Sequence, residues 1–453
     1  MLQIYPISDA ALKWLEIIFA ERFGYSWNLI RFNKTLKLQV NGFNGSIIFD
    51  SLEDKLCQAN SDQPCLWWNA KSEGWKSVLG KEIPVIGKEK LPSPLIEMIG
   101  SSYTIHYDIP GLTYWMLSRL EEIGRTDLDV HDRFPASSSN AYKQKYLNRP
   151  VVDEWLDILS QVIKLQWPDL KLKKNEPRIN VTCDVDIPFE FDSSLRKLPR
   201  IIVRDLIKRK SVTSLKRNIL GSFYSVLNIH KFDNNRKGIE FIMNTNESVG
   251  RSVSFYFIPY QTDDNYDGTT NLYHPKIKSL IQEIYGRGHE IGIHPGYNTF
   301  CNSNNMASSV SLFRKFLEDS SIQQTYLGGR QHYLRWQTPF TQRLLEDNGL
   351  DYDSTLSYAD HPGFRCGTCF EYQMFDAIEQ KSLRLRQRPL ILMESSVISN
   401  DYMGLGYTDK SLDLMIAYRE ACHIVGGDFN ILWHNSHFIN EEDKKFYQTI
   451  INR

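Results

Sequence analysis

The stretch INVTCDVD, residues 179–186, decides the fold. It is the first of several short β-rich runs that alternate with helical segments from Arg178 onward. This alternation predicts a mostly parallel sheet or a barrel. In such folds the functional side chains gather at the carboxyl ends of the strands. The residues that follow each predicted strand are therefore the first candidates for a functional site.

Strands and helices follow one another along this region, which places the chain in the α/β class. The predicted strands cover residues 179–183, 239–243, 253–258, 290–294, 390–394 and 430–433. The predicted helices cover residues 203–219, 275–287, 310–317, 339–348 and 411–425.

The part of the chain that precedes these elements has a different pattern and is expected to fold separately. Residues 1–130 are predicted to form a smaller N-terminal α+β domain, with amphipathic helices at 10–23 and 111–123. Residues 131–177 are predicted to be a helical linker, and residues 178–453 the main domain.

The composition excludes several classes of function. The 453 residues include 53 Lys and Arg and 54 Asp and Glu, so the net charge of -1 gives no basic surface for nucleic acid. No run of apolar residues is long enough to predict a transmembrane segment. The N-terminus has no basic segment before an apolar run, and seven Cys, an odd number, argue against a disulfide framework. We therefore expect a cytoplasmic protein.

Asp184 and Asp186 end the stretch INVTCDVD and are the first candidate functional residues. Two residues apart in an extended segment, they share one face of the strand. Their charges repel unless a cation or a shared proton relieves them, so one can bind a metal ion while the other acts as a base. The structural alternative is a helix cap, or part of a calcium-binding loop, at the end of the strand.

His294 is a second candidate, because it follows a short predicted strand and precedes the turn residues Pro295 and Gly296. Imidazole and carboxylate are a common ligand set for Zn²⁺ and related ions. His289 points to the opposite face of the strand and is expected to be structural. A histidine at a strand end is more often a hydrogen-bonded surface residue, so this interpretation depends on its combination with Asp186.

Two later stretches carry further candidates. Arg330 and His332 share one face of GRQHYLRW if that stretch is extended, and an arginine near a carboxylate base keeps the base ionised and oriented. His434 ends the apolar stretch ILWH and could donate a proton to a leaving group or an oxyanion. The structural alternatives are a basic edge strand for the first stretch and a hydrogen-bonded core histidine for the second.

Cys366 and Cys369 form a single CxxC motif, which is weak support for a zinc site without a second pair. We expect a structural turn with two buried thiols. The sequence has no GxGxxG, P-loop or GxSxG motif, so the usual signals for nucleotide binding and for serine hydrolases are missing.

The order of these motifs resembles that of the polysaccharide deacetylases, the NodB-homology proteins of carbohydrate esterase family 4. The resemblance covers about residues 178–450. More narrowly, the chain is similar to a bacterial subgroup with an extra N-terminal domain. The marks of this subgroup are DIPG at 108–111, HDRFP at 131–135, RQHYLRW at 330–336, YDST at 352–355 and GFRCGTC at 363–369.

The resemblance implies a distorted (β/α) barrel, a divalent metal ion, usually Zn²⁺, and removal of an N-acetyl or O-acetyl group from a glycan. Asp184 matches the family's catalytic base and Asp186 its metal-binding carboxylate. His294 matches the first metal-binding histidine. Arg330 matches the arginine that positions the base, and His434 the general acid.

One position departs from the pattern of the family, which places a second metal-binding histidine four residues after the first. Here that residue is Asn298, whose neutral carbonyl oxygen is a poor Zn²⁺ ligand beside imidazole. His332 is the candidate for the missing ligand, with Asn298 as the alternative. A metal site with a substitute ligand could bind more weakly or prefer a harder ion.

Three hypotheses follow for the function. The first is a metal-dependent deacetylase whose partner is an acetylated glycan or oligosaccharide. The second is a carbohydrate-binding relative without catalysis, which Asn298 favours. The third is a metal-dependent hydrolase that acts on a small amide. In the N-terminal domain, Trp67, Trp68 and Trp75 could stack on sugars, although a packed core is the expected use of these rings.

Overall fold

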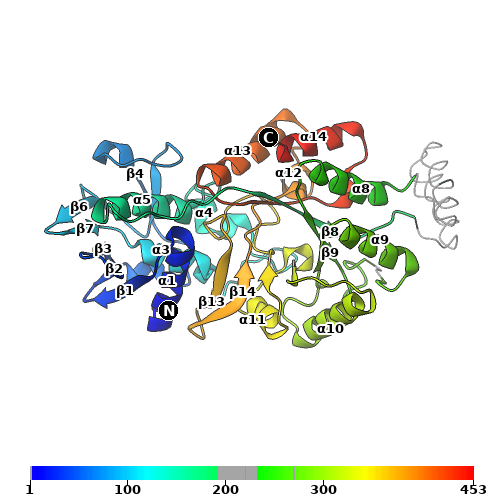
Figure 1. Cartoon of the computed structure of the whole chain (residues 1–453), viewed down its shortest axis with the longest axis horizontal. Helices are drawn as coiled ribbons and strands as arrows, with labels where there is room; N and C mark the ends of the chain where they lie inside the picture. Colours follow the sequence, from blue (N-terminus) through cyan, green and yellow to red (C-terminus); the bar gives the residue numbers. More distant parts are fainter. Residues whose placement is uncertain (1–2, 192–219, 221–231, 269–270, 453) are drawn as a thin grey trace. The chain divides into compact units, whose positions relative to one another are not determined.

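The computed structural model describes residues 3–191, 220, 232–268 and 271–452 (Figure 1). The predicted helix at 203–219 lies outside the described residues. The chain divides into two compact units. Unit 1 comprises Met1–Asn180, Tyr297–Ala307 and Tyr326–Ile431, and unit 2 comprises Val181–Gly296, Ser308–Thr325 and Leu432–Arg453.

Unit 2 is built on three parallel strands with helices between them (Figure 1). Its elements are β8 (Ile179–Val185, which begins in unit 1), α8 (Asn234–Glu247), β9 (Val253–Phe257), α9 (Pro275–Gly286), β10 (Glu290–Ile293), α10 (Ser303–Asp319, which also begins in unit 1) and α14 (Glu441–Ile451). Most of the buried residues of the three strands are β-branched or aromatic, as expected for a parallel sheet that is covered on both faces.

The segment 239–243, predicted as a strand, is part of helix α8, so that prediction is wrong. Asp233 caps the helix, since its side chain accepts a hydrogen bond from the N–H of Arg236. Ile239, Ile242 and Met243 then fall on one buried face at helical spacing. A short apolar run fits either a strand or a buried helix, and here the cap and the helical spacing decide.

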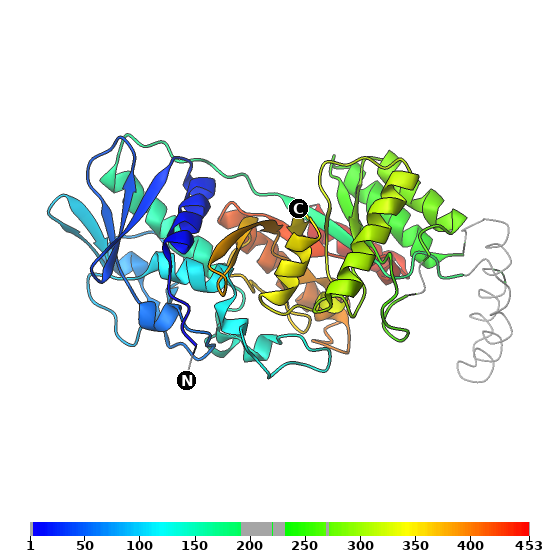
Figure 2. The same ribbon diagram turned by 90° about the horizontal axis from the view of Figure 1, so that it is seen from below.

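Unit 1 has an N-terminal part built on a five-stranded sheet with the order β1-β2-β3-β7-β6 (Figure 2). Its strands are β1 (Trp27–Phe32), β2 (Thr35–Val40), β3 (Ile47–Asp50), β6 (Ile96–Ile99) and β7 (Ser102–Ile105), and a separate hairpin joins β4 (Cys65–Trp68) to β5 (Ile83–Ile86). The helices of this part are α1 (Asp9–Phe23), α2 (Glu53–Leu56), α3 (Ile109–Leu117), α4 (Asn140–Lys143) and α5 (Val151–Gln166). Helix α1 packs on β1, and α5 contacts β3, β5 and β7. Trp68 stacks on Trp155 at 5.6 Å, so this tryptophan is part of the core, as expected. Trp67 is exposed and Trp75 is half-buried, so the expectation of a packed core is wrong for Trp67.

Unit 1 also contains a second group of strands from the later part of the chain. Parallel pairs join β11 (Gly328–Gly329) to β12 (Tyr352–Asp353) and β12 to β14 (Lys381–Gln387), and β13 (Tyr372–Asp376) pairs antiparallel with β14. The other elements are α11 (Phe340–Asp347), β15 (Leu392–Met393), α12 (Glu394–Ile398), α13 (Asp409–Ile424) and β16 (Phe429–Leu432). The α/β class with parallel strands is therefore confirmed, whereas the domain boundaries at residues 130 and 177 stay predictions.

Within unit 1, the N-terminal residues pack directly on the later strands. Trp14 of α1 stacks on Phe375 of β13 with ring centroids 5.1 Å apart, and its indole N–H donates to the carbonyl of Gln373 at 2.7 Å. Cys366 and Cys369 are buried and Gly367 has φ +67°, so the CxxC motif is the buried turn that the sequence predicts. Among the described residues, no helix combines the length and the apolar character that crossing a membrane requires.

The helix predicted at 111–123 ends early, and a buried ionic network explains how its last residues are used. Arg119 takes φ +54°, which ends α3 and leaves Leu120–Glu122 as a short 3-10 helix. Glu122 then accepts hydrogen bonds from Arg119 at 3.0 Å and from Arg365 at 2.7 and 2.8 Å. Burial alone would raise the pKa of Glu122, but the two guanidinium groups outweigh it and lower the pKa to about 2.

We predict that Glu122→Gln lowers the free energy of unfolding by about 3–5 kcal/mol, because the variant leaves two buried guanidinium groups without their common carboxylate. Since the pKa of Glu122 is depressed in the folded protein, this contribution is complete above pH 4.5 and is lost as the pH falls toward 2. Urea denaturation followed by circular dichroism measures both effects.

Asp127→Asn is the matched control, because Asp127 is half exposed and pairs with Arg125 at the surface. We expect a change below about 1 kcal/mol for this variant. Equal effects of the two substitutions would contradict the assignment of Glu122 as a buried anchor.

Candidate active site

Three strand ends of unit 2 lie in register at one edge of the sheet. Val185 of β8 pairs with Phe257 of β9, and Phe257 pairs with Ile293 of β10. The chain therefore leaves β8 and β10 at the same level, and the next residues are Asp186 and His294. This register places a carboxylate and an imidazole that are 108 residues apart in sequence at the carboxyl edge of the same sheet.

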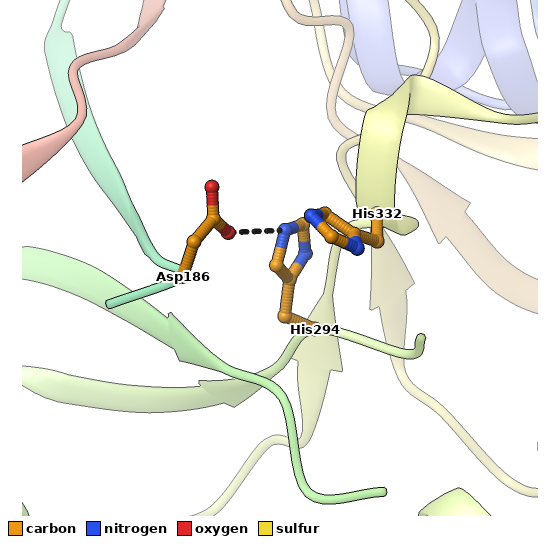
Figure 3. A group of neighbouring side chains, drawn as sticks. All are labelled: Asp186, His294 and His332. Carbon is orange, nitrogen blue, oxygen red and sulfur yellow. Dashed lines mark ion pairs between the residues drawn. The ribbon is translucent and has the colours of Figure 1, made fainter. Parts of the chain in front are cut away.

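The side chains of these residues face one another (Figure 3). His294 Nε2 lies 3.4 Å from Asp186 Oδ1 and 3.7 Å from Asp184 Oδ2. Asp184 and His294 are buried, whereas the Asp186 side chain is 35% exposed. The two carboxylates and one imidazole thus form a cluster that is buried on the strand side and open on the side of Asp186.

His434 joins this cluster from the other end of the chain. The N–H of Trp433 donates to the carbonyl of Thr182 at 3.0 Å, which fixes the backbone of residue 433 alongside β8. His434 Nε2 lies 3.9 Å from Asp186 Oδ2, and its side chain is 18% exposed. The structure therefore brings Asp184, Asp186, His294 and His434 together within unit 2, as the sequence predicts, while their roles stay predictions.

The spacing of Asp186 and His294 fits two ligands of one metal ion. Two ligand atoms that each lie about 2.0–2.2 Å from a tetrahedral zinc ion are about 3.3–3.6 Å apart. The 3.4 Å between Asp186 Oδ1 and His294 Nε2 falls in this range and exceeds the length of a normal hydrogen bond. Carboxylate oxygen and imidazole nitrogen are also the donor types that Zn²⁺ accepts.

The turn after His294 is held by a loop that follows β9. Asp267 Oδ2 accepts hydrogen bonds from the N–H groups of Thr262 and Asp263 at 2.7 and 3.0 Å, which closes this loop. The loop lies so near Gly296 that a Cβ there would be 2.7 Å from Asp267 Oδ2 and 2.8 Å from the carbonyl of Tyr260. Only glycine fits at this position, which explains Gly296.

His289 has a structural role, as the sequence predicts. Its Nδ1 accepts a hydrogen bond from the N–H of Val253 at 3.2 Å, and its Nε2 lies 3.0 Å from a carboxylate oxygen of Glu247. Burial lowers the pKa of His289, although Glu247 acts in the opposite direction. The imidazole is therefore used to join α8, β9 and β10.

Arg330 and His332, the other two predicted site residues, belong to unit 1 and follow β11. Arg330 is fully buried and donates hydrogen bonds to the carbonyl and the Oγ of Ser354 at 2.7 and 3.0 Å. Burial raises the pKa of the nearby Asp353 to about 6, although the charge of Arg330 lowers it. His332 is buried and begins a short 3-10 helix, His332–Leu334. The roles of Arg330 and His332 stay predictions.

Asn298, the position that departs from the family pattern, is bound to an arginine of the same unit. Its Oδ1 accepts a hydrogen bond from Arg335 Nη1 at 3.2 Å. Arg335 also donates to the carbonyls of Tyr297 and His131 at 2.8 and 2.9 Å and to Asp132 at 2.7 Å. An oxygen that faces a buried guanidinium group is a poor site for a second cation, because the two positive charges repel.

The loop that carries His332 is held by Arg335 and by residues of the HDRFP string, for which no side-chain role is predicted from the sequence. Tyr333 and Leu334 take φ +63° and +55°, which strains non-glycine residues. Arg133 donates to the carbonyl of Tyr333 at 3.1 Å and supports this strained turn. The signal in the sequence was the joint presence of HDRFP and RQHYLRW, whose charged residues contact one another in the structure.

Comparisons with known proteins give a family match in the N-terminal part. The model of a family of unknown function, DUF7033, matches residues 14–168. A search of the curated proteins finds no match.

Solved structures that resemble the chain include two provisionally assigned polysaccharide deacetylases and the Puue allantoinase. The deacetylase from Mycobacterium smegmatis is 17% identical, with a TM-score of 0.38, over 63% of this chain and 86% of that one. The allantoinase is 13% identical, with a TM-score of 0.36, over 63% and 85%. The deacetylase from Pseudomonas aeruginosa PAO1 is 11% identical, with a TM-score of 0.37, over 61% and 84%.

We predict that His294→Gln lowers the affinity for Zn²⁺ at least about 100-fold, because a lost ligand costs more than the 10–100-fold of a lost supporting contact. Competition with a chromophoric chelator measures the affinity. His289→Gln is the matched control, since it removes a buried imidazole beside the same strand that only joins backbone elements. Equal loss of zinc binding in both variants would contradict the site.

Proposed function

We propose that the protein is a metal-dependent hydrolase that removes acetyl groups from a carbohydrate, in the manner of polysaccharide deacetylases. One observation carries the proposal: Asp184, Asp186 and His294 meet at the carboxyl edge of three parallel strands, with 3.4 Å between Asp186 and His294. The order of the sequence motifs adds support from the family that they resemble. The same resemblance is the ground for proposing a distorted (β/α) barrel.

In this proposal, Asp186, His294 and His332 hold a divalent metal ion, and zinc is the expected metal. Each of the three side chains offers one ligand atom of a type that zinc accepts. Asn298 is the weaker candidate for the third ligand, because its Oδ1 accepts a hydrogen bond from Arg335. The hydrogen bond from Arg133 to the carbonyl of Tyr333 supports the turn that begins at His332. Such support suits a metal ligand, whose side chain must keep a fixed direction.

The proposed chemistry divides the work among the remaining side chains. When bound, the metal supplies polarisation of the acetyl carbonyl and acidification of a water molecule. Asp184 accepts the proton of the attacking water, for which its buried carboxylate beside His294 is suited. His434, at the more exposed side of the cluster, donates a proton to the leaving amine or alkoxide. Arg330 keeps its proposed role as the residue that positions the base.

A carbohydrate-binding relative without catalysis is the second candidate. The observation that favours it is Asn298, which stands where the family pattern has a metal-binding histidine. In that case glycans bind, zinc binds weakly or not at all, and no acetate is released under any metal.

We predict that the purified protein releases acetate from N-acetylated oligosaccharides only when it holds a divalent metal, and that Asp184→Asn slows release by about 10²–10⁴-fold. The zinc affinity of Asp184→Asn should stay within about 10-fold of that of the unchanged protein, because in this proposal Asp184 accepts a proton and does not bind the metal. An enzymatic acetate assay measures the rate. An Asp184→Asn variant as fast as the unchanged protein would contradict the proposed base.

The identity of the third ligand can be tested by a pair of variants. We predict that His332→Ala lowers zinc affinity at least about 10-fold, whereas Asn298→Ala changes it by less than about 3-fold. Isothermal titration calorimetry gives both values. The reverse order would assign the ligand to Asn298.

A further inference from the structure

A cavity of about 620 Å³ lies within unit 1, and none of the candidate site residues lines it. This volume falls among those of small-molecule sites, which are about 300–1,000 Å³. The wall is formed by α1, by α5, by the connector at 173–178 and by later residues that include 368, 370–372 and 386. All of these residues belong to unit 1, so the cavity is formed by that unit alone.

Arg22, at the end of α1, is the most informative residue of this wall. Its side chain is only 9% exposed, and its guanidinium carbon lies over the ring of Phe370, 3.6 Å from the ring centroid. Within the part of the chain that the structure describes, its buried Nη1 has no hydrogen-bond partner. A buried donor without an acceptor is costly, more so when it is charged. An acceptor from outside the chain would remove that cost.

Asp153 is the carboxylate nearest to Arg22, but its oxygens are used by other donors. The distance from Arg22 Nη1 to Asp153 Oδ1 is 3.5 Å, which is long for a charged hydrogen bond. Oδ1 accepts from the hydroxyl of Thr368 at 2.8 Å, and Oδ2 accepts from the N–H of Cys369 at 3.0 Å. Burial also raises the pKa of Asp153, with Arg22 acting in the opposite direction, which weakens its repulsion of a bound anion.

The other acidic residues that are partly buried in the wall are paired. Arg386 donates to Glu21 at 2.9 and 3.1 Å, and Arg178 donates to Asp428 at 2.9 and 3.1 Å. Glu371 is bound by Arg386 and Arg388. The exposed connector adds two positive charges and one negative charge, from Lys173, Lys174 and Glu176. The wall as a whole has five basic and five acidic side chains, so their formal charges balance. Arg22 differs from the other basic residues because it is buried and its nearest carboxylate oxygen, at 3.5 Å, is bound by another donor.

The wall also has an apolar part, which indicates the rest of the ligand. It is formed by Ile18, Leu117, Val152, Leu156 and Phe370. The cavity therefore places apolar side chains close to the guanidinium group of Arg22.

We propose that this cavity binds a small organic anion, whose phosphate or carboxylate is held by Arg22 and whose apolar part lies against α1, α5 and Phe370. Arginine suits this role because its planar fork binds both groups through two parallel hydrogen bonds. The site is separate from the proposed metal site and does not depend on it.

Titration calorimetry of the full chain with phenyl phosphate, benzoate and benzyl alcohol tests the proposal. These probes share an aromatic body and differ in the polar group. We expect at least one of the two anions to bind with a Kd of about 1 mM or tighter and the neutral alcohol to bind at least about 10-fold more weakly. The anion with the lower Kd shows whether the site prefers a phosphate or a carboxylate. Absence of binding by both anions, or equal binding of the alcohol, would overturn the proposal.

Arg22→Met keeps the apolar stem on Phe370 and removes the charge, so we expect at least about 10-fold weaker binding of the preferred anion. Arg236→Met, in unit 2, is the control and should bind as the unchanged protein does. Unchanged binding in Arg22→Met overturns the proposal.

A crystal of the unchanged protein soaked with the preferred anion gives a test that does not depend on the folding of the variant. The proposal expects the anionic group within hydrogen-bond distance of the Arg22 guanidinium. A probe that binds elsewhere, with this cavity empty, would overturn it.

Discussion

Two carboxylates that leave one buried strand within three residues repel each other, and this repulsion is the constraint on which the proposed site depends. Asp184 is buried, so its charge is poorly solvated, and the imidazole of His294 lies 3.7 Å from its Oδ2. The ends of β8, β9 and β10 are aligned, and this alignment brings His294 to the same edge of the sheet as both carboxylates. A divalent cation offsets such repulsion, and this is the physical ground for the metal-dependent chemistry proposed for this edge of the sheet.

Unit 1 uses buried charge in another way, to join distant segments of the chain. Glu122 ties the end of α3 to Arg365, and Arg335 ties the segment at 131–132 to the loop at 297–298. These arginines and carboxylates are paired with short hydrogen bonds, so they order the fold and leave no charge for a ligand. Arg22 differs from them because its nearest carboxylate is bound by other donors, and this difference supports a binding role.

The sequence predicted the elements that position the site because each combined a β-rich run with a following helix. The strands at 179–183, 253–258 and 290–294 are present, and so are the helices that follow the last two. The prediction of a strand at 239–243 is wrong, since a five-residue apolar run does not reveal its period and Asp233 caps a helix over this segment. The carboxylates and histidines at strand ends could be predicted from position alone. The bonds of Arg335 and Arg22 could not, because they join residues that are far apart in the chain.

The central claim is that the edge of β8 and β10 holds a metal ion through Asp186 and His294. Anomalous diffraction at the zinc absorption edge, from crystals soaked with Zn²⁺, tests it most directly. The account predicts one strong peak about 2.0–2.2 Å from an Asp186 oxygen and from His294 Nε2. Crystals in which zinc binds only elsewhere, with Asp186 and His294 still 3.4 Å apart and no peak between them, would contradict it.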